Sequence, residues 1–135
     1  MSPNTFNKKA LIQYRLERAI QTLDEAQVLY EHNKSPQSIV NRSYYSMFYA
    51  TLALLATIDS ESFKHSGVIA LFDKNFVKQK ILPKEMSLML HEAFESRQEG
   101  DCKDFSKIDR DKATEILKSA EVFINFVKEK LSGQP

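Results

Sequence analysis

Hydrophobic residues recur at helical spacing along most of the chain. Between about Lys8 and His32 they follow alternating steps of four and three, at Ile12, Leu16, Ala19, Leu23, Ala26 and Tyr30. Such steps place side chains on one face of an α-helix. No segment shows the period of two that indicates a half-buried strand. The pattern therefore predicts an all-α protein whose first helix packs along one face.

The second predicted helix, from about Gln37 to Ile58, is apolar on nearly every side. Arg42 is its only charged residue after Ile39. A helix without a polar face has to be surrounded by other helices. A long cation in such a helix has to reach water, a carboxylate or a bound anion. We therefore expect this helix to serve both as scaffold and as part of a site.

Three further helices follow from the pattern. A shorter one is predicted within residues 62–76, a long one from Pro83 to about residue 98, and a final one after Asp109, which is suited to cap it. The last helix carries a strong stripe of Ala113, Ile116, Leu117, Ala120, Phe123, Ile124, Val127 and Leu131. These elements predict an up-and-down four-helix bundle with an additional short helix between the second and third long helices.

Length and composition are those of one compact domain. The 135 residues are 42% hydrophobic and 27% charged, so we expect a single helical domain over residues 1–135, fraying at about 1–6 and 132–135. The net charge of +1 argues against a large, uniformly basic nucleic-acid face. Cys102 is the only cysteine, and neither the polar N-terminus nor the apolar run 44–58 suits a signal peptide or a membrane span. We expect a cytoplasmic protein without membrane contact.

Two clusters are candidates for binding chemistry. Arg42, Tyr45 and Tyr49 share a helix face, where a guanidinium and a ring suit a phosphate and a base. The alternative is that the tyrosines belong to the core or to a dimer interface, with Arg42 paired to an acidic side chain of another helix. Lys64 and His65 stand where the short helix begins, and exposed N–H groups there favour a phosphate. The alternative is that His65 or Ser66 caps the helix while Gly67 permits close packing.

Three segments in this order resemble one known family. They are NRSYYSMFYATLALL at 41–55, KHSGVIALF at 64–72 and AFESRQEGD at 93–101, and together they resemble the HEPN domain family of prokaryotic helical-bundle proteins. The resemblance extends over most of the chain. It implies a bundle that commonly forms a homodimer and is often encoded beside a minimal nucleotidyltransferase, as a toxin–antitoxin pair or a related defence module. Many members of the family are metal-independent ribonucleases.

The chain departs from the ribonuclease signature of that family, which is an Arg followed after four to six residues by a His. Arg97 matches the Arg, but Cys102, Lys103 and Asp104 occupy the positions where the His is expected. In the family the His moves a proton during attack of the ribose 2′-hydroxyl, and the Arg stabilises charge in the transition state. Loss of a general acid or base typically removes a factor of about 10² to 10⁴ in rate, so we expect inefficient cleavage.

The leading hypothesis is a binding component without efficient catalysis. It recognises a nucleotide, RNA or a nucleotidyltransferase partner, needs neither metal nor cofactor, and has no assigned catalytic residue. Its candidate binding residues are Arg42, Tyr45, Lys64, His65 and Arg97. One alternative is a ribonuclease toxin in which Arg97 stabilises charge and His65 or Lys103 handles the proton. That alternative fails if His65 and Arg97 lie at opposite ends of the bundle. A second alternative is a purely structural dimerisation module.

Overall fold

All the regular structure in the described part of the chain is helical. The structure, a computed structural model, describes residues 3–102 and 108–133. Its elements are α1 (Pro3–Glu31), α2 (Pro36–Thr57), α3 (His65–Phe72), a π-helical turn η1 (Asp73–Val77), α4 (Lys84–Cys102) and α5 (Arg110–Ser132). The predicted all-α class is confirmed, and α3 is the short helix expected between the second and third long ones.

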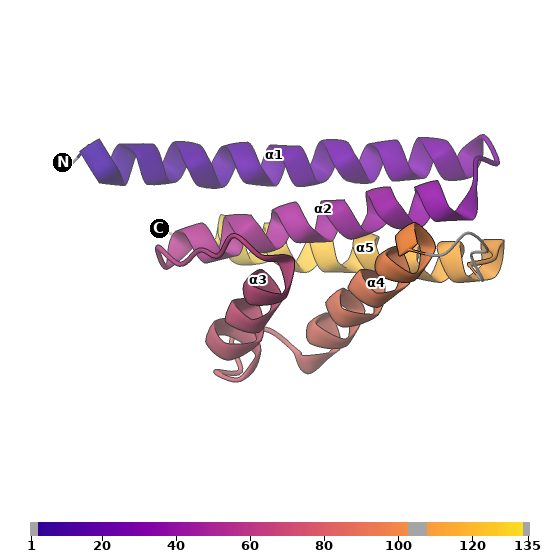
Figure 1. Cartoon of the computed structure of the whole chain (residues 1–135). Helices are drawn as coiled ribbons and strands as arrows, with labels where there is room; N and C mark the ends of the chain where they lie inside the picture. The colour runs from indigo at the N-terminus through magenta and orange to yellow at the C-terminus, as the bar shows by residue number, and fades with distance from the viewer. Residues whose placement is uncertain (1–2, 103–107, 134–135) are drawn as a thin grey trace.

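The helices α1, α2 and α5 lie roughly side by side, whereas α3 and α4 are inclined to them (Figure 1). Helix α2 packs against each of α1, α3, α4 and α5, which explains why its sequence lacks a continuous polar face. Because α4 crosses the bundle obliquely, the arrangement is less regular than the up-and-down bundle that the sequence predicts.

The core is assembled around α2. Fully buried side chains of this helix meet buried side chains from all the later helices. The largest of these are Ile39, Val40, Tyr44, Met47, Leu54 and Leu55 of α2, Phe72 of α3, Met86 and Leu90 of α4, and Ile116, Phe123 and Ile124 of α5. Phe72 stacks with Phe76 of η1 at 6.1 Å between ring centroids. It also contacts Phe123 at 5.7 Å, and this aromatic contact packs α3 against α5.

The starts of two helices are fixed by side-chain caps. The Ser35 hydroxyl accepts a hydrogen bond from the Ser38 N–H in front of α2, and Pro36 occupies the first turn. Asp109 caps α5 as predicted, by accepting from the Lys112 N–H at 2.8 Å. Such caps stabilise a helix by about 1 kcal/mol each.

The ends of the chain differ in part from expectation. Helix α1 begins at Pro3 rather than near Lys8 as the periodicity predicted. A proline in the first turn is compatible with this start, because that turn needs no hydrogen-bond donor. Residues 1–2 and 134–135, which we expected to fray, lie outside the described residues, as do Lys103 and Asp104. No helix of the described ranges is long and apolar enough to cross a bilayer.

Candidate functional site

Two adjacent tyrosines of α2 form the centre of the candidate site. Tyr44 is fully buried, whereas Tyr45 is partly exposed, and their rings meet edge to face at 5.2 Å. Successive residues of a helix point about 100° apart, so one ring faces the core while the other faces outward. Phe94 of α4 packs on the Tyr44 ring at 5.7 Å. The pair therefore connects the core of the bundle with its surface.

His65 is held against this pair from the first turn of α3. Its Nδ1 lies 2.7 Å from the Tyr44 hydroxyl, and its ring stacks on Phe48 with 4.2 Å between centroids and 13° between planes. The ring also meets the edge of Tyr45 at 5.7 Å. His65 is not the cap of α3, because Lys64 is the cap residue and its helix has no side-chain cap. The imidazole is thus fixed by stacking and by one hydrogen bond.

The environment of His65 determines which of its nitrogens carries the proton. Burial, and then the charge of Arg97, lower the pKa of His65, which favours the neutral ring. Burial raises the pKa of Tyr44, which keeps its hydroxyl protonated. Within the described residues that hydroxyl has no acceptor other than Nδ1. We therefore assign Tyr44 as the donor to Nδ1, which leaves the ring proton on Nε2.

Two arginines lie over the outer tyrosine. Arg97 of α4 donates from Nη2 to the Tyr45 hydroxyl at 3.0 Å, and its guanidinium carbon is 5.3 Å from the Tyr45 centroid. Arg42 of α2 lies 5.2 Å from the same centroid. It also pairs with Glu25 of α1 at 3.6 Å and donates to the Asn41 side chain at 2.9 Å. Arg42 thus has the acidic partner from another helix that one of the alternatives anticipates.

The structure brings together four of the five predicted binding residues. Tyr45 lies beside Tyr44, and Arg42, His65 and Arg97 contact this tyrosine pair. Hence His65 and Arg97 do not lie at opposite ends of the bundle, and the charge of Arg97 acts on His65. Lys64 is exposed, and its backbone bonds to the Ser62 side chain and to the Val68 N–H of α3. Lys64 therefore does not join this cluster.

Sequence reasoning missed one supporting part of the site and one contact beside it. Tyr44 and Phe48, which orient the imidazole, are one helical turn apart in a segment whose apolar residues all resemble core. Beside the site, Arg18 of α1 contacts Tyr49 of α2. Arg18 is exposed and lies outside the apolar stripe of its helix, so its sequence context carries no signal of this contact. In the described residues, no group of three or more His, Cys, Asp or Glu side chains is placed to hold a metal ion.

Gly67 allows the segment before α3 to lie close to its first turn. A Cβ at position 67 would lie 2.1 Å from the Ser62 Oγ and 2.9 Å from the Ser62 Cβ. We expect Gly67→Ala to lower the free energy of unfolding by about 1–3 kcal/mol through this overlap. Urea denaturation measures the loss, and adding Ser62→Gly, which removes both atoms, should restore most of it. A Gly67→Ala protein as stable as the wild type would contradict this packing.

The lowered pKa of His65 predicts how the stability of the protein depends on pH. In the unfolded chain a histidine titrates near about pH 6.5, and the folded structure lowers that pKa. Below this pH the unfolded state binds the proton more readily, so the free energy of unfolding falls as the pH falls. His65→Gln should reduce the loss of stability between about pH 7.5 and about pH 5.5, measured by urea denaturation. The exposed His32, replaced in the same way, is the control. An unchanged pH dependence in His65→Gln would refute the prediction.

The chain is similar to known proteins over most of its length. The family model described as HEPN domain matches residues 12–130, which includes all the residues of the cluster. A UPF0332 protein of Thermotoga maritima is 34% identical over 90% of this chain and 91% of its own length. Putative toxin MJ0142 of Methanocaldococcus jannaschii is 34% identical over 86% of this chain and 78% of its own. Putative toxin MJ0605 of the same organism is 31% identical, over 89% and 88% respectively.

Proposed function

Because this chain belongs to the HEPN domain family, we propose that it is the RNA-binding component of a toxin–antitoxin or related defence module, and that it binds through the cluster around Tyr44 and Tyr45. The observation that carries the proposal is the meeting of Arg97 and His65, from two different helices, at one tyrosine pair. The type of module is supported by the names of two relatives, putative toxin MJ0142 and putative toxin MJ0605.

The cluster has the chemistry that a nucleotide requires. The planar guanidinium of Arg97 suits bidentate contact with a phosphate, and its bond to Tyr45 holds it in place. The partly exposed ring of Tyr45 is a surface on which a base stacks. The Nε2–H of His65 is a further donor, because no described residue accepts from it. The Arg97 guanidinium, the Tyr45 ring and the His65 N–H together recognise a phosphate and the base next to it.

The protonation of His65 favours recognition over cleavage. A general base for the 2′-hydroxyl needs a lone pair on the nitrogen that faces the substrate. Here the lone pair is on Nδ1, where it accepts from the buried Tyr44 hydroxyl. The same bond fixes the proton on Nε2. The histidine is therefore arranged as a donor to an anion, and the signature His after Arg97 is absent from the sequence.

A metal-independent ribonuclease is the second candidate, favoured by the same convergence of His65 and Arg97 on the tyrosine pair. This function requires that the Tyr44–His65 bond breaks or reverses when RNA binds, so that a lone pair becomes available on Nε2. Arg97 would then stabilise charge on the phosphorus.

One experiment separates the two candidates. Purified protein is mixed with labelled single-stranded RNA of about ten nucleotides, binding is followed by fluorescence anisotropy, and the recovered RNA is analysed on a gel. We expect saturable binding with intact RNA. Cleavage that disappears in both His65→Gln and Arg97→Ala would establish the ribonuclease instead. Absence of binding to RNA and to nucleotides would refute both.

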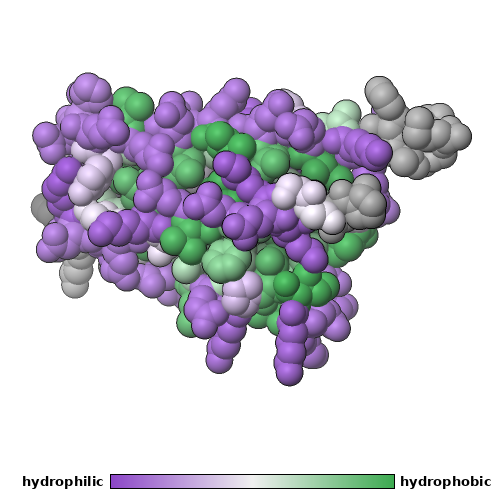
Figure 2. Space-filling view, turned by 180° about the vertical axis from the view of Figure 1, so that it is seen from behind, coloured by the Kyte–Doolittle hydropathy of each residue, from purple (hydrophilic) through white to green (hydrophobic). Residues whose placement is uncertain are grey.

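We propose in addition that the protein forms a homodimer and binds a minimal nucleotidyltransferase, as the family resemblance implies. Large apolar side chains exposed within the described ranges support a partner surface, among them Phe63 and Leu88, the latter at 60% exposure. Figure 2 shows apolar residues among polar ones on the face opposite to that of Figure 1. Light scattering tests the dimer, and co-purification with a nucleotidyltransferase encoded nearby tests the partner. A monomeric mass and no co-purification would refute these two proposals.

A further inference from the structure

A second arginine–tyrosine contact lies beside the cluster, at the seam between α1 and α2. Arg18 of α1 donates from Nη2 to the Tyr49 hydroxyl at 3.3 Å and from Nη1 to the Tyr14 hydroxyl at 3.4 Å. Its guanidinium carbon lies 4.9 Å from the Tyr49 centroid. Arg18 and Tyr14 are exposed, and these hydrogen bonds raise the pKa of Arg18. The result is a cation at the surface that lies over one tyrosine ring and bonds to the hydroxyls of two tyrosines.

This contact is continuous with the candidate site. Tyr49 lies one helical turn after Tyr45, and the two ring centroids are 6.0 Å apart. Tyr45 in turn carries Arg97 and Arg42. Rings and cations therefore form a continuous series from Arg97 of α4, through Tyr45 and Tyr49 of α2, to Arg18 on the exposed side of α1. Aromatic side chains lined by cations suit a single-stranded nucleic acid, because its bases stack on the rings and its phosphates pair with the cations.

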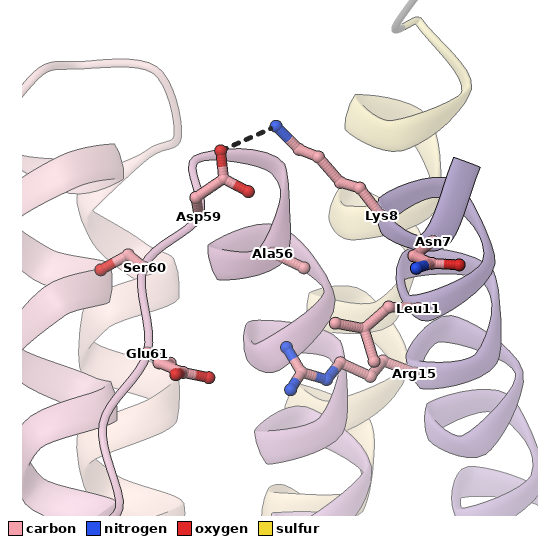
Figure 3. A pocket seen from close by; sticks show the side chains of 8 residues that line it. All are labelled: Asn7, Lys8, Leu11, Arg15, Ala56, Asp59, Ser60 and Glu61. Atoms are coloured by element: carbon pink, nitrogen blue, oxygen red, sulfur yellow. Dashed lines mark hydrogen bonds and ion pairs between the residues drawn. The ribbon is translucent and has the colours of Figure 1, made fainter. Parts of the chain in front are cut away.

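The seam continues beyond Tyr49 into a pocket of about 450 Å³. Figure 3 shows this pocket between the first turns of α1 and the segment after α2, with α2 between them. Arg15 crosses the seam to donate to the Leu52 carbonyl at 3.1 Å, and Lys8 pairs with Asp59 at 3.3 Å. The pocket at the far end of the seam is lined by the carboxylates Asp59 and Glu61 as well as by Lys8 and Arg15, so the formal charges around it balance.

The length of the seam and the charges along it indicate which kind of ligand it suits. The α2 residues along it, Tyr45, Tyr49, Leu52 and Ala56, follow steps of four, three and four, so they span about 16 Å of helix. In the described residues, Arg15 and Arg18 form no ion pair, whereas Lys8 and Arg42 are each paired with a carboxylate. The middle of the seam therefore holds two cations without a neutralising partner, and a run of phosphates supplies the matching charge.

We propose that the α1–α2 seam is a track for single-stranded RNA, in which Tyr14, Arg18 and Tyr49 bind the nucleotide next to the one held at Arg97. The track makes an oligonucleotide, rather than a mononucleotide, the ligand of the protein. This inference rests on the proposed function and adds to it a second subsite. Arg18 neutralises a phosphate, and Tyr14 and Tyr49 supply the stacking surfaces.

The test compares uridine monophosphate with an oligouridylate of about ten nucleotides. Arg18→Gln should weaken oligouridylate binding about tenfold and reduce the slope of log affinity against log salt by about 0.7. Tyr14→Ala should weaken it by about five- to hundredfold through lost stacking. Neither variant should change the affinity for the mononucleotide, which occupies the Arg97 subsite alone. Anisotropy measures the oligonucleotide and calorimetry the mononucleotide.

A matched control is available on another side of the bundle. Arg110 lies 4.2 Å over the Tyr30 ring and donates to the Tyr30 carbonyl at 3.2 Å, so Arg110→Gln removes the same charge from a similar contact. This variant should bind both ligands like the wild type. Thermal unfolding of all the variants verifies that they are folded.

The possible outcomes are distinguishable. If Arg18→Gln and Tyr14→Ala bind oligouridylate like the wild type while Arg97→Ala does not, the track is refuted and the proposed function stands. If these two variants change only the molecular mass in light scattering, the seam is an interface between copies of this chain, and the track is again refuted. If the wild type binds neither ligand, the proposed function itself fails.

Discussion

Arg97→Ala is expected to weaken the binding of single-stranded RNA by about ten- to hundredfold. The guanidinium supplies charge and two parallel donors to a phosphate, and alanine supplies neither. Unlike Arg18→Gln, this substitution should affect uridine monophosphate and oligouridylate alike, because Arg97 belongs to the subsite that both occupy. Fluorescence anisotropy at one fixed salt concentration measures the change for RNA, since such affinities depend strongly on salt.

Two further variants make this prediction specific. Arg97→Lys keeps the charge but loses the parallel N–H donors of the guanidinium and the hydrogen bond to Tyr45. Its affinity for RNA should therefore lie between those of Arg97→Ala and the wild type. Arg42→Ala should have a smaller effect, because Arg42 is already engaged by Glu25 and Asn41. Equal losses in Arg42→Ala and Arg97→Ala would indicate general electrostatic attraction rather than a defined subsite. No loss in Arg97→Ala would remove the basis of the proposed site.

Phe72→Ala is expected to lower the free energy of unfolding by about 3–5 kcal/mol. The Phe72 ring is fully buried between Phe76 and Phe123, so truncation leaves a cavity and breaks the contact of α3 with α5. This loss is a large part of the total stability of a typical domain, about 5–15 kcal/mol. Urea denaturation followed by circular dichroism measures it.

Phe63 provides the control for this substitution within the same segment. Its side chain is as exposed as in an extended chain, with a relative exposure of 102%. Phe63→Ala should therefore change stability by no more than about 0.5 kcal/mol. Similar losses at Phe63 and Phe72 would contradict the orientation of α3. Because α3 carries His65, a destabilised α3 should also weaken RNA binding, whereas Arg97→Ala should weaken binding without a comparable loss of stability.

Helical periodicity was sufficient to predict most of the fold. The stripes of α1 and α5, the cap at Asp109 and the apolar surface of α2 depend on residues close in sequence, and each of these features appears in the structure. The inclination of α4 was not predictable in this way. It depends on how side chains from distant segments fit together, and periodicity reports which face is buried but not the angle at which it packs.

The candidate site was predictable in its parts but not in its assembly. Tyr45 and Arg97 are 52 residues apart, and Tyr44 and His65 are 21 apart, so their contacts depend on the tertiary arrangement. Lys64 and His65 are neighbours in sequence, yet only the histidine turns toward α2. The residue before a helix and the first residue within it have different backbone angles, and sequence alone did not show which would face the core.

The position of α2 at the centre of the bundle has an evolutionary consequence. One side of this helix fills the core, and the other carries the tyrosines proposed to contact RNA. Substitutions in α2 are therefore expected to alter folding and RNA recognition together, so few of them can change ligand preference alone. The exposed side of α1, with Tyr14 and Arg18, contributes little to the core and can vary at low energetic cost. New ligand preferences should therefore arise more readily through α1, and α1 is the better starting point for engineering them.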